Sequence, residues 1–346
     1  MRIYSIDLLK LLFAYLIAFS HLNIYLPGAG SAVAFFFIIS GYFLARKYYS
    51  KKIANEKGAY NGALYTLEHI KSLYPHYIFS LVVMFAYFCV RNVYYIYTDN
   101  SSAISLMAML HKAFYLLPEI FMVQNIGFFD GGMNYPLWQV CALLICGYFI
   151  YSLLCYNEKL SIHIIFPLSI ILIQVYLKHS SVDLFDTVGM VYIPLIRAFS
   201  AIAYGVLLYK FLNSEYYARH IIRHKLFLNC CSIVALVSIF VLIDNNILFI
   251  TGAFIMAALV NPNSWLNAVL NRKASRQFGE FSYAIYLNHA LVIWFVRDFK
   301  NKIFGLLRTA EAEWKTAVLF FVILTVYSVV TTYIIKTFKK KRCNKL

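Results

Sequence analysis

Two ionisable residues bracket an otherwise apolar stretch near the N-terminus, KLLFAYLIAFSH, which begins at Lys10 and ends at His21. In an α-helix, eleven residues at about 100° each complete about three turns, so the two side chains would share one face, about 16 Å apart along the axis. That face would carry a cation and an imidazole, which can carry a proton near neutral pH. Asp7 lies three residues before Lys10 and can pair with it. These residues are therefore candidates for a functional site, although all three could instead reach the membrane interfaces.

Three other apolar stretches contain candidate residues. AFFFIISGYFLARK has Ser40 and Gly41, where the missing side chain lets another helix or a ligand approach the backbone. YIPLIRAFSAIAYG holds Arg197 with no acid nearby in sequence, and a buried guanidinium needs a partner from another helix or an anionic ligand. FGEFSYAIYLNHALVIW holds His289. Ordinary helix packing is the alternative role for Gly41 and His289.

The elements that must position these residues are membrane helices. The chain is 62% apolar, 18% aromatic and only 13% charged, and its mean hydropathy is +0.69, outside the range of soluble domains. Runs of the roughly 20 apolar residues that cross a bilayer recur along it. Because runs such as IFSLVVMFAYFCV lack period-two alternation, we predict an all-α, polytopic integral membrane protein.

Ten spans are expected, at 5–26, 31–45, 74–96, 136–156, 161–178, 190–210, 226–243, 246–260, 281–297 and 315–335. The short second and eighth spans would be tilted or locally broken.

The basic residues predict the orientation of these spans. A further apolar stretch at 104–123 contains His111, Lys112, Pro118 and Glu119, so we expect an interfacial or re-entrant segment and not a span. With both termini in the cytoplasm, cytoplasmic segments hold 21 of the 31 Lys and Arg residues and outer segments hold 8, as the positive-inside rule requires. A basic face against anionic lipid then accounts for the net charge of +16 without a nucleic-acid partner.

The organisation expected is one membrane-embedded domain, residues 1–346, with no appended soluble domain. The first apolar stretch is too long for a cleavable signal and lacks a small-residue cleavage site, so it should remain as a span. The seven cysteines form no C-x-x-C pair and mostly lie within spans. They predict buried thiols, with neither a metal site nor a disulfide framework.

Six segments occur in the order expected of the acyltransferase-3 superfamily of bacterial membrane O-acyltransferases, which the chain resembles over nearly its entire length. They are MRIYSIDLLKLLFAYLIAFSH, AFFFIISGYFL, YPHYI, YPLWQVCALLICGYFIY, IRAFSAIAYG and FSYAIYLNH. The first is the most specific, because the family's signature is a basic residue, ten intervening residues and a histidine, here Lys10 and His21. No single segment would suffice, but six in order make coincidence improbable.

The resemblance implies a multi-pass enzyme of the bacterial plasma membrane that moves an acyl group, usually acetyl from cytoplasmic acetyl-CoA, to a sugar hydroxyl. The acceptor is often a surface or capsular polysaccharide or its lipid-linked precursor. Transfer from a thioester to an alcohol needs a base for the hydroxyl proton and donors for the developing oxyanion. His21 is then the expected general base, with an acyl-histidine intermediate as an alternative. The expected partners are acetyl-CoA, the glycan and the lipid bilayer, with no metal and no nucleic acid; a homo-oligomer is compatible with this reading.

The resemblance also assigns roles to the other candidates. Lys10 belongs with His21 in the catalytic set, and its cation, with those of Lys71 and Arg197, is expected to hold the CoA phosphates or the thioester carbonyl. The expected acyl-CoA-binding residues are Lys71, Arg197, Ser40 and Gly41. The residues expected to line the acceptor pocket or support it are Asp7, Trp138, Tyr148 and His289.

The chain departs from the family pattern in two places. Many members carry an arginine pair before the YP of the third span, where this chain has HIKSLYPHYI with Lys71 as the only basic residue. Many also have a tryptophan followed by a serine and a glutamate, where this chain has LWQVCALLICGY, so no carboxylate is assigned there. Some relatives add an extracytoplasmic hydrolase-like domain that completes the transfer. Without one, the membrane domain must bind the acceptor itself or pass the acyl group to another protein.

A non-enzymatic glycan exporter or flippase is the rival interpretation, because many spans and buried charges would suit it equally well. A conduit needs charge but no proton acceptor, so the Lys10 to His21 spacing together with His289 favours the enzyme. A glycan polymerase would be expected to carry a large outer loop, which only the region 97–135 approaches.

Overall fold

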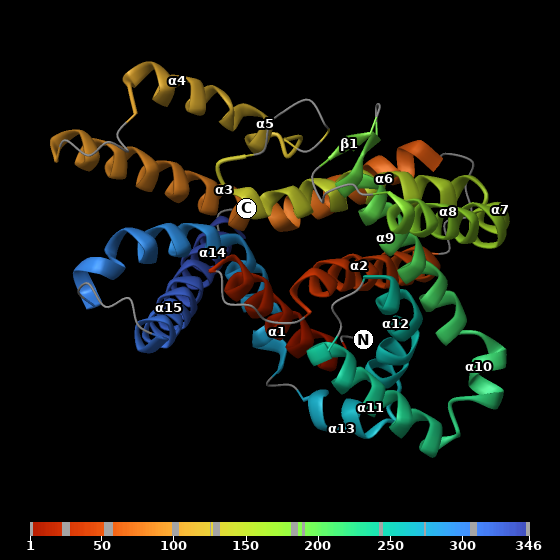
Figure 1. Cartoon of the computed structure of the whole chain (residues 1–346). Coiled ribbons are helices and arrows are strands. Elements are labelled where there is room, and N and C mark those ends of the chain that lie inside the picture. Colours follow the sequence, from red (N-terminus) through yellow and green to blue (C-terminus); the bar gives the residue numbers. More distant parts are fainter. Residues whose placement is uncertain are drawn as a thin grey trace. The chain divides into compact units, whose positions relative to one another are not determined.

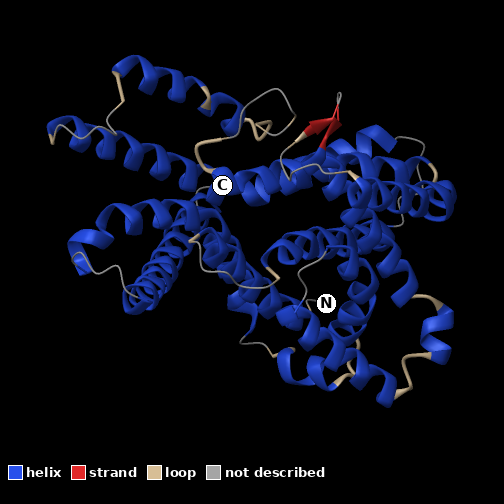
Figure 2. Cartoon of the chain, viewed as in Figure 1, coloured by secondary structure: helices blue, strands red, loops and turns tan. Residues whose placement is uncertain are grey.

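The computed structural model describes residues 3–22, 28–51, 58–98, 104–124, 126, 132–180, 186–188, 191–241, 245–272, 275–304 and 310–343. Almost all of its regular structure is helical (Figure 2). The strands in the described residues are β1 (Thr187–Val188) and β2 (Val191–Tyr192), which pair in antiparallel fashion with Thr187 opposite Tyr192. The predicted all-α class is therefore confirmed.

The helices follow one another along the chain as labelled in Figure 1. They are α1 (Tyr4–His21), α2 (Ala29–Lys51), α3 (Gly58–Tyr97), α4 (Leu106–Phe114), α5 (Leu116–Ile120), η1 (Tyr135–Leu137), α6 (Trp138–Tyr156), α7 (Glu158–Leu160), η2 (Ser161–Ile165, a π-helical turn), α8 (Phe166–His179), α9 (Ile193–Leu212), α10 (Glu215–His220), α11 (Lys225–Val241), α12 (Asn245–Val260), α13 (Trp265–Leu270), α14 (Ser275–Phe304) and α15 (Ala310–Cys343).

Seven helical segments in the described residues are long and apolar enough to cross a bilayer: 4–21, 29–50, 58–97, 135–156, 158–179, 193–212 and 314–340. Each coincides with a predicted span. The other three predicted spans fall on α11, α12 and α14. A polytopic membrane protein is thus confirmed, whereas the number of ten spans and the cytoplasmic termini stay predictions. The predicted span ends at 23–26, 190 and 242–243 lie outside the described residues.

Two helices are longer than their apolar runs suggest. The second predicted span, 31–45, is part of a continuous 23-residue helix, α2. The third, 74–96, is the second half of the 40-residue α3, which contains Pro75. At 1.5 Å per residue α3 is about 60 Å long, roughly twice the hydrocarbon thickness of a bilayer. Hydropathy marks the part of a helix that suits lipid, so the polar first turns of α3 were missed.

The segment 104–123 forms two short helices instead of a span. Ser105 caps α4, accepting a hydrogen bond from the Ala108 amide at 3.2 Å, and Tyr115 separates α4 from α5. The nine residues of α4 cover only about 13 Å. This agrees with the prediction that the segment does not cross the membrane; its interfacial position stays a prediction.

The chain forms two compact units. Unit 1 comprises Met1–Ile17, Tyr25–Ile70 and Ala142–Ser282, and unit 2 comprises Ala18–Ile24, Lys71–Cys141 and Tyr283–Leu346. The predicted organisation as a single membrane-embedded domain is not tested by this division and stays a prediction.

In unit 1, α2 and α9 pack with their backbones in close approach. A Cβ added to Gly41 would overlap the carbonyl group of Ile202, and one added to Gly205 would overlap that of Ile38. Reciprocal glycines at a helix crossing are the usual device for such packing in membranes. The first turns of α3 pack on α6 in the same way, since a Cβ on Gly58 would lie 2.7 Å from the Ser152 carbonyl oxygen.

In unit 2, α14 packs against α3 and α15. Met84 of α3 and Ala290 and Leu291 of α14 form a buried cluster, with Trp294 and Tyr327 against it. The Ser80 hydroxyl donates to the Leu287 carbonyl at 2.9 Å, which fixes α3 to α14 by a buried hydrogen bond. These contacts hold the part of α14 that carries His289.

Candidate active site

Two histidines from opposite ends of the sequence lie side by side in unit 2. His21 is the last residue of α1, and His289 lies in the middle of α14. Their ring centroids are 5.3 Å apart and their planes are inclined by 16°, so the rings stack. His21 is exposed, whereas His289 is fully buried. The pair therefore combines an exposed imidazole, that of His21, with a fully buried one, that of His289.

The hydrogen bonding of His289 defines its tautomer. Its Nδ1 lies 2.7 Å from the Tyr286 carbonyl oxygen. A carbonyl oxygen can only accept, so Nδ1 carries the proton and the neutral ring keeps its lone pair on Nε2. Nε2 is buried and has no hydrogen-bond partner among the described residues. A buried polar atom left unpaired is costly and calls for an explanation in the site's chemistry.

Tyr135 completes an aromatic trio with the two histidines. Its ring centroid lies 4.9 Å from that of His21 and 5.7 Å from that of His289. It begins the 3₁₀ turn η1, where Pro136 occupies one of the first positions. The Tyr286 hydroxyl donates to the Pro136 carbonyl at 2.7 Å and so ties η1 to α14 beside His289.

Arg297 supplies a cation next to His21. It is exposed near the end of α14, and its Nη2 donates to the His21 carbonyl oxygen at 3.1 Å. The last carbonyls of a helix lack intrahelical partners, so an arginine at the end of α1 is favoured by both hydrogen bonding and the helix dipole. The guanidinium keeps further N–H groups that could serve an anionic or polarised ligand.

Sequence reasoning found the two histidines but not Tyr135 or Arg297. Tyr135 stands in the quoted segment YPLWQVCALLICGYFIY, where only Trp138 and Tyr148 were selected. Arg297 was counted only as an outer basic residue. Neither carries a local signal, because its role depends on which helix lies beside α14.

Unit 2 contains two further predicted site residues, Lys71 and Trp138, which are not part of this trio. Lys71 is exposed on α3, as a residue that meets a soluble ligand would be. Trp138 is buried at the first residue of α6. Their predicted roles in acyl-CoA and acceptor binding stay predictions.

Lys10 and Asp7 belong to the part of α1 in unit 1. The Lys10 ammonium lies 5.1 Å from the centroid of the Phe43 ring, a cation–π contact. Asp7 is buried, and its carboxylate lies so close to Gly279 that a Cβ there would overlap it. The single helix α1 carries Lys10 and His21, as their spacing predicted.

The remaining predicted residues are also in unit 1. The Ser40 hydroxyl donates to the Phe36 carbonyl at 2.8 Å, a bond within its own helix. Gly41 serves the α2–α9 crossing described above. Arg197 of α9 is partly buried, and its Nε has no hydrogen-bond partner in the described part of the chain. Tyr148 is partly buried on α6. Among these, Arg197 keeps the strongest requirement for an anionic partner.

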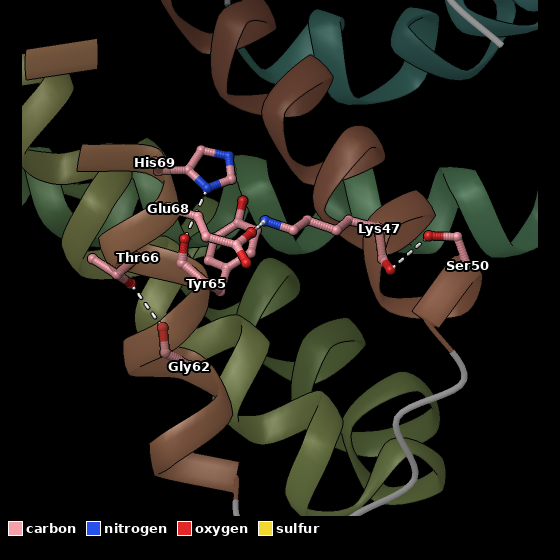
Figure 3. A network of polar contacts seen from close by, with 7 residues as sticks. All are labelled: Lys47, Ser50, Gly62, Tyr65, Thr66, Glu68 and His69. Carbon is pink, nitrogen blue, oxygen red and sulfur yellow. Dashed lines mark hydrogen bonds and ion pairs between the residues drawn. The ribbon is translucent and has the colours of Figure 1, made fainter. Parts of the chain in front are cut away.

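A polar network that the sequence did not single out joins α2 to α3 in unit 1 (Figure 3). Lys47 pairs with Glu68, and its ammonium lies 4.8 Å from the Tyr65 ring centroid. His69 Nδ1 donates to the Tyr65 carbonyl at 3.0 Å. Because Lys47 is already neutralised by Glu68, this network holds the start of α3 in place and offers little free positive charge.

No group of three or more His, Cys, Asp or Glu side chains that could hold a metal ion occurs in the described ranges. This arrangement suits acid–base chemistry, because the His21 side chain is exposed and a cation and an aromatic ring border it.

Comparison with known proteins identifies a family. A family model described as acyltransferase domain, that of the acyltransferase-3 family, matches residues 3–337. The match spans residues of both units and includes His21, Tyr135, His289 and Arg297. No curated protein and no solved structure matches the chain significantly.

Proposed function

The chain belongs to the acyltransferase-3 family, and on that premise we propose that it moves an acetyl group from cytoplasmic acetyl-CoA to a sugar hydroxyl. The acceptor in this proposal is a surface or capsular polysaccharide or its lipid-linked precursor, and the site of action is the bacterial plasma membrane. That the protein is a membrane acyltransferase follows from its family and its apolar helices. The acyl group, donor and acceptor are the proposed part.

The observation that carries the proposal is the stacked pair of His21 and His289, with His21 accessible. His21 takes the proton of the sugar hydroxyl, and the oxygen attacks the carbonyl carbon of the thioester. As the tetrahedral intermediate collapses, the C–S bond breaks and the proton passes from His21 to the CoA sulfur. Attack by His21 itself, giving an acyl-histidine that the sugar hydroxyl then cleaves, is the second route.

The neighbours of His21 suit the charge that develops in this reaction. Negative charge grows on the carbonyl oxygen, and donors already fixed in place stabilise it most effectively. Arg297, bonded to the His21 carbonyl, and the Tyr135 hydroxyl are the donors that we assign to this role. Lys10, Lys71 and Arg197 remain the proposed cations for the CoA phosphates, with Ser40 and Gly41 in the same proposed set.

The test compares glycan acetylation in cells that lack the gene and in cells complemented with wild type, His21→Ala or His220→Ala. His220 is an exposed histidine on α10 and serves as the matched control. We expect O-acetyl NMR signals of the purified glycan to return with wild type and His220→Ala and to stay absent with His21→Ala at equal expression. A loss of glycan export with unchanged acetylation per sugar would instead identify a conduit.

A further inference from the structure

A fully buried carboxyl group lies in α5, outside every candidate span. Glu119 is 0% exposed. Its Oε1 accepts a hydrogen bond from the backbone N–H of Asn134 at 3.1 Å. Its Oε2 is buried with no hydrogen-bond partner among the described residues. Burial raises its pKa to about 7, opposed by the backbone N–H groups of Asn134 and Met133. Burying an ionisable group is costly, so its presence needs a reason beyond space filling.

The chain just before η1 is shaped around this carboxyl group. A Cβ added to Gly132 would overlap the Glu119 carboxyl, and it would lie 2.6 Å from Glu119 Cδ. Because Glu119 is enclosed on all sides, its side chain could not move away cheaply. Glycine at 132 therefore allows the backbone of 132–134 to lie directly on the carboxyl group.

The side chain of Asn134 connects this segment to α14 by hydrogen bonds. Its Nδ2 lies 3.0 Å from the Ser80 hydroxyl and 3.1 Å from the Leu287 carbonyl oxygen. On the other side of Tyr135, the Pro136 carbonyl accepts from Tyr286 at 2.7 Å. The two neighbours of Tyr135 are thus both fixed to the stretch of α14 just before His289.

We propose that Glu119 is a positioning residue: through Asn134 it holds Tyr135 against His21 and His289. The proposal rests on the proposed function in treating those histidines as the reacting groups. Among the described residues, Glu119 contacts neither histidine directly, so its effect must pass through the 132–136 segment. This predicts that removing Glu119 and removing Tyr135 have the same consequence, and that doing both adds nothing.

The kinetic test uses the purified full-length protein in lipid nanodiscs, with radiolabelled acetyl-CoA and glycan extracted from the deletion strain. We expect Glu119→Ala and Tyr135→Ala each to lower kcat about tenfold, since a displacement of about 1 Å at the reacting groups can cost up to about a hundredfold. The KM for acetyl-CoA should not change. The double variant should also be about tenfold slower than wild type, whereas a product of about a hundredfold would overturn the proposal. Glu119→Gln keeps a side-chain oxygen that can accept from the backbone N–H of Asn134. The kcat of this variant should therefore stay within about threefold of wild type.

A second readout does not depend on acyl transfer. Diethyl pyrocarbonate modifies accessible histidines, and mass spectrometry follows the rate at His21, with exposed His220 as the internal reference. Glu119→Ala should increase the His21 rate severalfold relative to His220, because Tyr135 no longer packs against one side of the His21 ring. An unchanged ratio would overturn the positioning role even if the protein proved to be an acyltransferase. An increased ratio in a protein without transferase activity would instead overturn only the proposed function.

Gly132→Ala provides an independent variant should Glu119→Ala fold poorly. Its added methyl group would displace the segment from the carboxyl group, so it should reproduce the loss of kcat and the faster His21 modification. In the Glu119→Ala background the clash is gone, and Gly132→Ala should then have no further effect. A Gly132→Ala variant with wild-type kcat and wild-type His21 reactivity would contradict the proposal.

Discussion

At the scale of the residue, His289 can be tested more specifically than His21, because two roles predict different outcomes. Asparagine at 289 keeps a side-chain N–H near the position of Nδ1, and so can keep the bond to the Tyr286 carbonyl, but it has nothing at the position of Nε2. If the unpaired Nε2 takes part in proton transfer, His289→Asn should lower kcat by at least about tenfold with an unchanged unfolding midpoint. Radiolabelled acetyl transfer and thermal unfolding in detergent measure the two quantities.

A purely packing role for His289 gives the reverse pattern. His289→Asn would then retain most activity and lose stability in proportion to the vacated volume. His69→Asn is the matched control, since His69 Nδ1 also donates to a carbonyl in the preceding turn of its own helix, that of Tyr65, but His69 lies in unit 1 and outside the trio. It should leave kcat near the wild-type value.

The pKa of Glu119 leads to a prediction about stability and pH. Burial raises this pKa from its ordinary 4.5 to about 7, so the folded protein holds the proton more tightly than the unfolded chain. The stabilisation is complete below pH 4.5 and is lost as the pH rises to 7, a change on the order of 2 to 3 kcal/mol in the free energy of unfolding. Glu119→Gln has no proton to lose and should remove this part of the pH dependence.

Unfolding midpoints of wild type and Glu119→Gln between pH 5 and 7.5 check this. The difference between the two proteins isolates Glu119, because all other groups are shared. Tyr77, whose hydroxyl donates to the Glu119 carbonyl at 2.7 Å, ordinarily titrates only near pH 10 and so does not interfere. Parallel curves for the two proteins would mean that Glu119 does not change its ionisation in this range.

Residue types predicted part of the site but not its assembly. An imidazole in an apolar run is conspicuous, so His21 and His289 were selected from sequence. That their rings stack depends on α1 ending beside α14, a long-range contact that no local pattern encodes. Tyr135 and Glu119 were missed as site residues for the same reason: each is an ordinary residue until the fold places it.

At the scale of the element, Gly41 tests whether the α2–α9 crossing is tight enough to need glycine. Gly41→Ala would place a methyl group onto the Ile202 carbonyl, and overpacking of this kind costs about 1 to 3 kcal/mol in the free energy of unfolding. Gly30→Ala is the control within the same helix, because a Cβ there meets nothing within 4 Å. It should be neutral or slightly stabilising.

Thermal unfolding of both variants in the same detergent distinguishes packing from ligand binding at Gly41. A lower midpoint for Gly41→Ala and an unchanged KM for acetyl-CoA would assign the glycine to packing. An unchanged midpoint with a raised KM would support the predicted acyl-CoA-binding role instead.

Helix positions were more predictable than helix lengths. In the described residues each predicted span falls on a helix, except that the sixth, 190–210, begins with strand β2 before α9, because continuous apolar runs in lipid have few other options. The start of α3 was missed because residues 58–73 contain more polar residues than the rest of the helix, and Gly58 and Gly62 pack closely on α6 there. Apolar runs therefore predict where a helix meets the membrane and leave its polar extensions undetermined.

At the scale of the whole molecule, the orientation in the membrane decides whether His21 can meet a glycan on the outer side. Ten spans with cytoplasmic termini place α4 outside and α10 inside, whereas counting 104–123 as a span would invert every later segment. Lys112 and Arg219 are exposed residues on these two helices.

Single cysteines at the two positions, in a cysteine-free background that retains activity, report directly on which side of the membrane each helix lies. A membrane-impermeant maleimide added to intact spheroplasts should label Lys112→Cys at once and Arg219→Cys only after permeabilisation. If both were labelled in intact cells, the span count between them would be even and the predicted topology would be wrong. Labelling of Arg219→Cys alone would invert the protein and place the end of α1, with His21, on the cytoplasmic side, so the acceptor would then have to be acetylated before export.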